Sequence, residues 1–426
     1  MTQAFDTQGF DTVLSGLAEI RGDLGGLYRD LHLHPELSFQ EERTAGVIAG
    51  RLTALGIEAT TGVGRTGVVG VLRNGTGPTV LLRADFDALP VREQTGLPYA
   101  STATGVDPEG NEVPVMHACG HDVHVTCLLG ALTLLSRARE TWSGTVLAVF
   151  QPAEEIGAGA QAMVDDGLFT RFPKPDVSLG QHVIPLPAGQ VGIRGGTTMA
   201  SADSLEVRMY GRGGHGSQPQ NTVDPIVLAA STVLRLQTVV SREVDANDPA
   251  VLTVGSLHAG TKANIIPDEA VLRLNIRAFN ERVRTQIREA VERIVRSEAA
   301  ASGAPKDPRI SVIDDFPVTV NTPEAADRTA GALRAALGEE RVSELPPFAG
   351  SEDFGIFGTA AGVPSVFWFF GGVDPDMHAK AKEAGRLNQE VPSNHSPFFA
   401  PVPDPTIDTG VKAMVAGALE WLDAPG

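Results

Sequence analysis

The sequence contains few cysteines and few basic residues, and both shortages limit what the protein can be. Two cysteines in 426 residues cannot build a disulfide framework, so we expect a reducing, cytoplasmic environment. Lysine and arginine number 34 against 52 aspartates and glutamates, and the net charge is −18. This excess of negative charge argues against nucleic acid or an anionic membrane as a partner. An anionic substrate would need a local positive site, from a metal ion or an arginine.

Long apolar runs are also missing. No run reaches the roughly 18–20 residues that a membrane span requires, so no membrane partner is expected. Residues 1–10 are polar and acidic and lack the basic and apolar regions of a signal peptide, which again predicts a cytoplasmic protein. The length predicts about two or three domains at roughly 150 residues each.

The order of the expected elements indicates an α/β protein that carries an insertion. In residues 1–194 we expect helices at 11–33, 41–55 and 121–139, a further helix after Glu155 with Ala160, Met163, Val164 and Leu168, and strands at 66–72, 79–82, 145–150 and 177–180. Residues 195–314 instead predict the order β-α-β-β-α-β of a ferredoxin-like unit, with strands at 204–210, 251–257, 270–277 and 309–313 and helices at 221–240 and 281–299. Signals typical of α/β proteins return in residues 315–426, with helices expected at 323–337 and 405–422 and a strand at 365–370. The fold class is therefore a catalytic domain with a mixed, mostly parallel sheet flanked by helices, interrupted by a smaller α+β domain.

Side chains that can bind metal follow these strands. Cys119 and His121 lie two positions apart at the start of a helix, and a thiolate beside an imidazole suits zinc or a similar divalent ion. Asp85 and Asp87, Glu154-Glu155 and His182 each come at or just after the end of an expected strand. In open α/β sheets, ligands bind at the carboxyl ends of the strands, so we expect these groups to meet at one site.

Each of these signals also has an ordinary structural explanation. Cys119 could be a small buried residue, and Glu154-Glu155 could be a solvated helix start. His182 could be a hydrogen-bonded structural histidine, His395 a surface residue, and His215 a turn residue between glycines. Their joint occurrence on the appropriate loops favours a functional site. There, one carboxylate of the glutamate pair would bind metal while its neighbour exchanges a proton.

Six motifs, which follow one another along nearly the whole chain, resemble those of the M20 metallopeptidase family. They are Arg83-Ala84-Asp85-Phe86-Asp87-Ala88-Leu89-Pro90, His117-Ala118-Cys119-Gly120-His121-Asp122, Gln151-Pro152-Ala153-Glu154-Glu155, Gly213-Gly214-His215-Gly216-Ser217, Gly350-Ser351-Glu352-Asp353-Phe354 and His395-Ser396-Pro397. The sequence is most similar to the amidohydrolase branch, subfamily D, which includes hydrolases of N-acyl amino acids, hippurate and auxin conjugates. The Cys-Gly-His-Asp motif is specific to this branch.

The resemblance implies two divalent metal ions per subunit, as zinc, manganese, cobalt or nickel. The residues that match the family's metal ligands are Cys119, His121, Glu155, His182 and His395. Glu154 matches its general base, and Asn264 and Arg277 resemble substrate-binding positions. The inserted domain is expected to serve as a lid and to form a homodimer, with a tetramer as a further option. In that dimer, His215 would reach a neighbouring active site and polarise the scissile carbonyl.

One position departs from the wider family pattern. Most members carry His-x-Asp after the early strand, whereas the first position here is Asp85. This fits the amidohydrolase branch, in which metal ligation moves to the Cys-Gly-His motif. For Asp85 and Asp87 we therefore expect a role in orienting a ligand histidine.

The activity implied by the resemblance is hydrolysis of the amide bond in N-acyl-L-amino acids to a carboxylic acid and a free amino acid. A dedicated biosynthetic deacetylase, for example of an N-acetylated diamino acid, would carry the same motifs, because the acyl pocket cannot be read from them. A metal-binding protein without catalysis is a third alternative. It would need neither Glu154 nor His215, because a structural metal site has no base and no open position.

Overall fold

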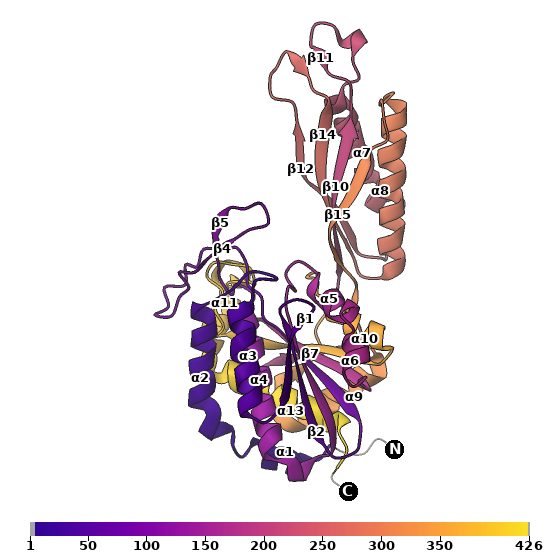
Figure 1. Ribbon diagram of the computed structural model, residues 1–426. Coiled ribbons are helices and arrows are strands. Elements are labelled where there is room, and N and C mark those ends of the chain that lie inside the picture. Colours follow the sequence, from indigo (N-terminus) through magenta and orange to yellow (C-terminus); the bar gives the residue numbers. More distant parts are fainter. Residues whose placement is uncertain (1–4, 425–426) are drawn as a thin grey trace. The chain divides into compact units, whose positions relative to one another are not determined.

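The computed structural model describes residues 5–424, and the chain divides into two units (Figure 1). The first unit comprises the residues up to 196, residues 320–346, and those from 353 onward. The second comprises residues 197–319 and 347–352, whereas the expected insertion was 195–314. The short segment 347–352 belongs to the second unit because the backbone of Phe348 bonds to Thr198 and Ala200.

An eight-stranded mixed sheet forms the centre of the first unit. Its strands lie in the order β1 (Glu58–Val63), β2 (Gly67–Asn74), β6 (Gly144–Gln151), β3 (Thr79–Asp85), β7 (Val177–Pro187), β18 (Ser365–Val373), β8 (Val191–Gly192) and β17 (Val342–Ser343). The four central strands, β6, β3, β7 and β18, run parallel to one another. These strands read as nearly continuous apolar runs because both faces of the sheet are covered. The predicted fold class is confirmed.

Helices pack on this sheet and on one another (Figure 1). They are α1 (Thr7–Leu14), α2 (Leu17–Leu33), α3 (Glu42–Ala54), α4 (His121–Arg137), α5 (Gly159–Asp165), α6 (Leu168–Arg171), α9 (Pro323–Leu337), α10 (Gly355–Ala361), α11 (Pro375–Glu383), α12 (Leu387–Glu390) and α13 (Pro403–Trp421). Helix α4 is buried along most of its length and packs against β3, β7, α2 and α13. It therefore holds its first residue, His121, at a fixed place beside the sheet.

Two expected helices are each divided in the structure. The helix expected at 11–33 is α1 and α2, which are separated at Ser15 and Gly16. The helical pattern expected after Glu155 is α5 and α6, divided by Gly167 with φ +85°. Both predictions of one continuous helix were wrong. The apolar spacing continues across Gly16 and Gly167, but glycine is a poor helix former and the helix is interrupted there.

The second unit is a four-stranded antiparallel sheet with two helices. Its strands lie in the order β12 (Ala250–Ala259), β14 (Glu269–Ala278), β10 (Ser201–Tyr210) and β15 (Arg309–Phe316). Helices α7 (Pro225–Arg242) and α8 (Glu281–Ala301) contact this sheet and each other. The chain order β-α-β-β-α-β is the predicted one. Helix α7 begins at Pro225, later than expected, because Asp224 caps it by accepting a hydrogen bond from Ile226 N at 2.8 Å.

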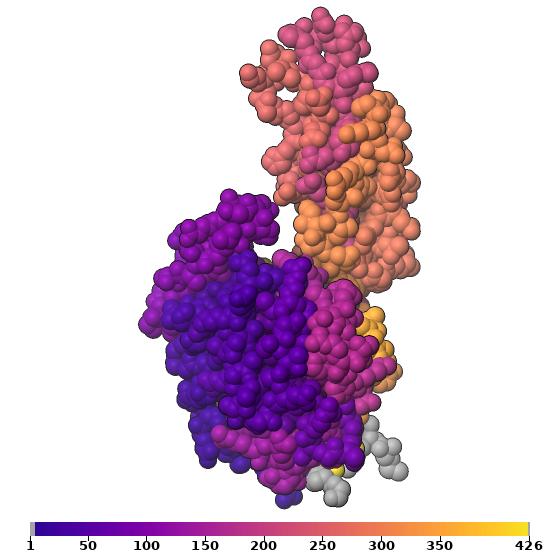
Figure 2. Space-filling model, viewed as in Figure 1, coloured from indigo at the N-terminus to yellow at the C-terminus, as the bar shows by residue number. Residues whose placement is uncertain are grey.

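The sequence pattern did not predict the hairpin of β4 (Thr104–Val106) and β5 (Glu112–Pro114). The hairpin projects from the rest of the first unit in Figures 1 and 2. Among the helices that the structure describes, none is both long and apolar enough to cross a membrane.

Asp203 is expected to stabilise the second unit strongly. Its buried carboxylate accepts hydrogen bonds from Arg284 Nε and Nη2, both at 2.9 Å, and from Arg288 Nη1 at 3.0 Å. Replacing Asp203 with Ala removes the buried partner of Arg284 and leaves only the more exposed Asp315 and Glu281, so it should lower the free energy of unfolding by about 3 kcal/mol. Urea denaturation followed by circular dichroism measures this loss. All three tryptophans, Trp142, Trp368 and Trp421, lie in the first unit. The unfolding transition followed by their fluorescence should therefore shift less in Asp203→Ala than the transition followed by circular dichroism.

Glu292→Ala is the matched control, because Glu292 pairs with Arg296 on the exposed face of α8. This variant should cost less than about 1 kcal/mol. Equal losses for Asp203→Ala and Glu292→Ala would contradict the structural role of Asp203.

Candidate metal centre

The predicted ligand residues gather at the carboxyl ends of the central parallel strands. Asp85 ends β3, and Glu154 and Glu155 follow the end of β6. His182 lies within β7, which continues to Pro187 and is longer than expected. The parallel register of β6, β3 and β7 places these positions at one edge of the sheet. Helix α4 starts at the same edge and brings Cys119 and His121.

Gly120 permits this close approach of Cys119 and His121 to the sheet. Its φ is +84°, and a Cβ atom at this position would lie 2.5 Å from the side chain of Val183. A residue with a side chain would therefore push the start of α4 away from β7.

Cys119 and His182 form one side of the centre. The Cys119 Sγ lies 3.5 Å from His182 Nε2. His182 Nδ1 lies 2.7 Å from the carbonyl oxygen of Val183, to which it donates. This bond leaves Nε2 without a proton in the neutral ring, which is the state that binds a metal.

Glu155 lies between two histidines on the other side. Its Oε1 is 3.7 Å from His121 Nε2, and its Oε2 is 3.4 Å from His395 Nε2. Cys119, His121 and Glu155 each offer a donor atom, and these atoms lie within 4.8 Å of one another. His395 is held by its backbone N, which donates to Ala118 O at 2.8 Å. The structure thus brings together the five side chains that were predicted to bind metal.

The donor set fits divalent cations. Among residues 5–424, neither His121 Nε2 nor Glu155 Oε1 has a hydrogen-bond partner, although both atoms are buried. Buried polar atoms normally have hydrogen-bond partners, so these two atoms indicate that a bound group, such as a cation, normally contacts them. Burial raises the pKa of the Cys119 thiol well above its usual range and raises the pKa of Glu155 to about 8. A cation here would favour the thiolate and the carboxylate and would pair the unpaired atoms.

Asp87 connects two of these groups. Its Oδ1 lies 3.3 Å from His121 Nδ1, and its Oδ2 accepts hydrogen bonds from Glu155 N at 3.0 Å and Ser38 Oγ at 2.6 Å. This arrangement suits the orienting role expected for Asp87, because a proton on Nδ1 leaves Nε2 of His121 for a metal.

Asp85 has different partners. Arg83 Nη1 donates to its Oδ2 at 2.7 Å, and His124 Nδ1 lies 2.5 Å from its Oδ1. His124 Nε2 accepts a hydrogen bond from Val183 N at 2.8 Å, so both ring nitrogens of His124 are engaged. Asp85 therefore orients His124, while His121 Nε2 is 3.5 Å away. Sequence analysis assigned no role to His124, although its position one turn after His121 on α4 was a usable signal.

Glu41 is a buried carboxylate that sequence reasoning missed. Its Oε1 accepts hydrogen bonds from Ala153 N and Phe39 N, both at 2.9 Å, and its Oε2 accepts one from Thr66 Oγ1 at 2.5 Å. Ala153 precedes Glu154 and has φ +48°, a conformation that is costly for a residue with a Cβ atom. Glu41 and Asp87 therefore hold the backbone on either side of Glu154.

The second unit carries the remaining predicted residues. His215 ends β11 (Gly214–His215), which pairs with β13 (Ile265–Ile266), and Gly216 N donates to Asn264 O at 2.8 Å. His215 and Asn264 are therefore neighbours. Ser217 N donates to His215 Nδ1 at 3.1 Å, so the proton of the neutral ring lies on Nε2. Arg277 is half-buried and donates to Ser351 Oγ at 2.8 Å.

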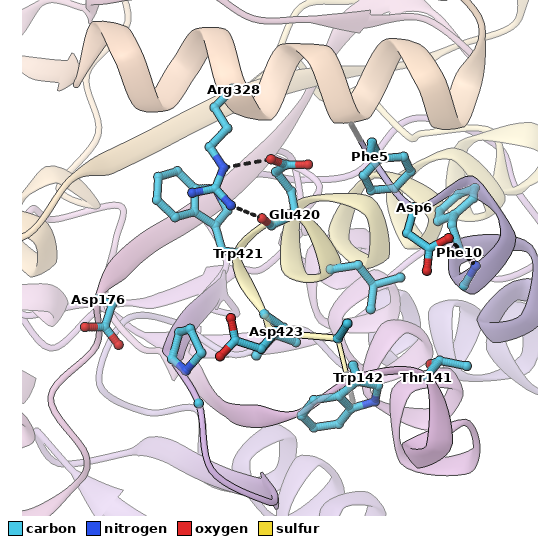
Figure 3. A pocket seen from close by; sticks show the side chains of 16 residues that line it. Phe5, Asp6, Phe10, Thr141, Trp142, Asp176, Arg328, Glu420, Trp421 and Asp423 are labelled. Carbon is cyan, nitrogen blue, oxygen red and sulfur yellow. Dashed lines mark hydrogen bonds and ion pairs between the residues drawn. The ribbon is translucent and has the colours of Figure 1, made fainter. Parts of the chain in front are cut away.

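Another cavity of the first unit, of ≈ 660 Å³, lies at the amino ends of β3, β6 and β7 (Figure 3). Its wall includes Arg328, which stacks on Trp421 at 4.1 Å and donates to Glu420 at 2.7 Å. None of the predicted site residues lines it. Because ligands in such sheets bind at the carboxyl ends of the strands, this cavity is not the candidate centre.

Comparison with known proteins agrees with this site. The family model described as Peptidase family M20/M25/M40 matches residues 81–389. The chain belongs to the M20 peptidase family. Thermostable carboxypeptidase 2 of Saccharolobus solfataricus is 38% identical over 348 residues, which are 80% of this chain and 84% of the relative. Hippurate hydrolase of Campylobacter jejuni is 38% identical over 344 residues, which are 80% of this chain and 86% of the relative.

Solved structures agree with the family. A dinuclear metal-binding M20 peptidase from Bacillus subtilis superimposes with a TM-score of 0.74 at 29% identity, covering 94% of this chain and 98% of that chain. The resemblance seen in the sequence is confirmed, and the protein is an M20 metal-dependent hydrolase of amide bonds.

Loss of the Cys119 thiol is expected to lower metal binding. Cys119→Ala removes the one sulfur donor among the described residues of the centre. Loss of a residue that only orients a ligand costs about 10–100-fold in metal affinity, and loss of this ligand should cost more. Metal content after dialysis against a fixed concentration of zinc, measured by mass spectrometry, tests this. Cys127→Ala is the matched control, because Cys127 is the other buried cysteine and bonds to Ile407 O at 3.7 Å, away from the centre. Full metal content in Cys119→Ala would remove Cys119 from the ligand set.

Loss of the Glu41 carboxylate is expected to slow turnover through the position of Glu154. Glu41→Ala releases Ala153 N, and misplacement of the following residue should lower kcat by about 10–100-fold with little change in KM. Glu41→Gln keeps an oxygen that can accept the same hydrogen bond and should recover part of the loss. Glu42→Ala, at the adjacent exposed acid, should behave as the unchanged protein. A rise in KM of about 10–100-fold in Glu41→Ala with unchanged kcat would argue against a positioning role.

Proposed function

We propose that this M20 hydrolase cleaves the amide bond of N-acyl-L-amino acids and releases a carboxylic acid and a free amino acid. The observation that carries the proposal is the convergence of Cys119, His121, Glu155, His182 and His395 beside Glu154. Here Glu155 Oε1 and His121 Nε2 have no hydrogen-bond partner among the described residues. The hippurate hydrolase relative supports this substrate class, because hippurate is an N-acyl amino acid. The predicted cytoplasmic location stays a prediction.

The mechanism assigns most steps to side chains of this chain. When bound, divalent ions would supply Lewis-acid activation of water and of the amide carbonyl. Glu154 would take a proton from the attacking water and pass it to the leaving amine. The proposal is supported by its position: Glu154 Oε2 lies 3.9 Å from His121 Nε2 and the side chain is almost fully buried. A buried carboxylate close to the metal ligands is suited to hold this proton.

His215 would stabilise the oxyanion that forms on the former carbonyl oxygen. Its Nε2–H is free to donate because Nδ1 accepts from Ser217 N. Removing one such donor typically costs about 10²–10³ in rate. Arg277, or Asn264, would bind the carboxylate of the amino acid, and the guanidinium is the better bidentate partner.

We propose further that His215 acts in the active site of a partner subunit in a homodimer. Two features of the second unit support an interface between copies. Val227 and Leu234, two turns apart on α7, are 65% and 73% exposed. The neighbouring strand β12 is a sheet edge and exposes Val251. An apolar stripe beside an open strand edge is a typical contact between identical subunits.

Replacing Glu154 with Gln is expected to abolish turnover while metal stays bound. The amide keeps the size of the side chain but cannot take the proton, so the rate should fall by at least about 10²-fold. The assay is release of glycine from N-benzoylglycine and N-acetylglycine after zinc, manganese, cobalt or nickel is added to metal-free protein, with a dipeptide as comparison. Metal content is measured in parallel. Full activity of Glu154→Gln would exclude it as the base, and inactivity of the unchanged protein on all acyl substrates would favour a narrower deacetylase or a non-catalytic metal protein.

Mixing two inactive variants is expected to restore activity if His215 acts across the dimer. In a mixed dimer of Glu154→Gln and His215→Ala, one site has both residues, so random exchange of subunits should give about a quarter of full activity. Adding Leu234→Glu to both variants should prevent the gain by breaking the α7 contact. Val312→Glu, at a residue that is 51% exposed on the opposite edge strand β15, is the control and should not prevent it. No gain from mixing would place His215 in its own subunit or outside the mechanism.

A further inference from the structure

A groove of ≈ 920 Å³ in the first unit is lined partly by residues that lie close in the chain to His182 and His395. One wall is the end of β7, at Pro185 and Leu186. The other wall is formed by α11 and α12, and residues from 391 to 398 complete the lining. Sequence analysis assigned no role to the segment of α11 and α12.

The groove is continuous with the segments that carry two predicted metal ligands. Pro185 comes three residues after His182 on β7, and Ser393 and Ser396 line the groove on either side of His395. Ser396 N donates to Ser393 O at 3.0 Å, which closes the turn that holds His395. Because the lining is built on the segments that hold two candidate ligands, the groove is a candidate subsite for a substrate whose amide lies at the centre.

The turn is also fastened to the centre itself. Between the two groove-lining serines, Asn394 Nδ2 donates to Cys119 O at 3.2 Å and to Val183 O at 3.1 Å. These bonds join the groove lining to α4 and β7. The groove and the candidate centre consequently share one supporting framework.

The lining suits a neutral apolar group. Its apolar members include Leu186, Leu387, Val391 and Phe398, and Phe398 is 53% exposed. Among the described lining residues, Glu390 and His378 are the two with acidic or basic side chains. Arg386 Nε donates to Glu390 at 2.5 Å. Burial and the nearby Lys382 lower the pKa of His378, which disfavours the charged form of the ring. The other polar side chains, Asn388, Gln389, Ser393 and Ser396, are uncharged, and the described lining contains no lysine or arginine for a carboxylate. The apolar part of its surface would gain from being covered.

We propose that this groove binds the acyl group of the substrate and favours bulky apolar acyl groups, aromatic or medium-chain, over acetyl. The proposal rests on the proposed function, because it assigns the acyl half of an N-acyl amino acid. The volume lies at the upper end of the range of about 300–1,000 Å³ typical of small-molecule sites, which is far more than an acetyl group fills. Orientation follows from charge: the neutral acyl end enters the groove and the anionic amino-acid end stays outside it.

The test compares three substrates that share glycine and differ only in the acyl group: N-benzoylglycine, N-hexanoylglycine and N-acetylglycine. For the full chain loaded with metal, kcat/KM for the benzoyl and hexanoyl substrates should each exceed that for acetyl by at least about tenfold. Phe398→Ala, which removes an apolar wall, should lower these two ratios by about tenfold. Leu387→Trp, which fills the groove, should lower them as well. Phe172→Ala changes a partly exposed phenylalanine outside the groove and should leave the ratios and the activity unchanged.

Equilibrium binding of hexanoate gives a readout that is independent of turnover. Calorimetry should show weaker binding of hexanoate to Phe398→Ala and Leu387→Trp than to the unchanged protein and to Phe172→Ala. Hydrolysis of all three substrates with equal ratios in every variant would overturn the groove and leave the amidohydrolase function standing. Preference of the unchanged protein for acetyl would also overturn the groove alone. No hydrolysis of any of the three with metal bound would overturn the proposed function itself, and the groove assignment with it.

Discussion

Negative charge packed at one end of a buried sheet is the constraint on which the rest of the first unit depends. Asp85, Asp87, Glu154 and Glu155 meet at the carboxyl ends of β3 and β6, and little of their side chains is exposed to water. A carboxylate in such a place needs donors, a proton or a cation. The buried Arg83 donates a hydrogen bond to Asp85, and Ser38 Oγ and Glu155 N donate hydrogen bonds to Asp87. Glu155 Oε1 has no such donor among the described residues, which is the physical reason that a cation fits there.

Sequence reasoning reached the location of the centre because one topological rule covers several residues at once. Once β3, β6 and β7 are read as parallel strands, the residues at their carboxyl ends must lie together. The start of α4 was equally readable, because the helical pattern begins directly at His121. The metal-binding and catalytic roles of these residues remain predictions, because proximity alone does not assign a role.

The parts that were missed depend on contacts between distant residues. Glu41 bonds to Ala153 across 112 positions, and no local pattern marks a glutamate at the start of α3 as a partner of that turn. The segment 347–352 belongs to the second unit through hydrogen bonds of Phe348 to Thr198 and Ala200, which apolar periodicity cannot reveal. Within the second unit the opposite holds. The alternation of Leu272, Leu274 and Ile276 along β14 made the sheet readable, since each of these side chains is buried.

Helices α11 and α12 lie largely outside the apolar core of the first unit. Among the described residues of α11 and α12, Ala381 is the one that is buried. Few side chains of these two helices therefore contribute to the stability of the fold. Selection on this segment is therefore weakly constrained by stability, because exposed substitutions usually change the free energy of unfolding by less than about 0.5 kcal/mol. The strand ends that hold the candidate ligands have no such freedom. Substitutions at α11 and α12 can therefore reshape the proposed groove at little cost in stability, whereas substitutions at the strand ends break buried hydrogen bonds.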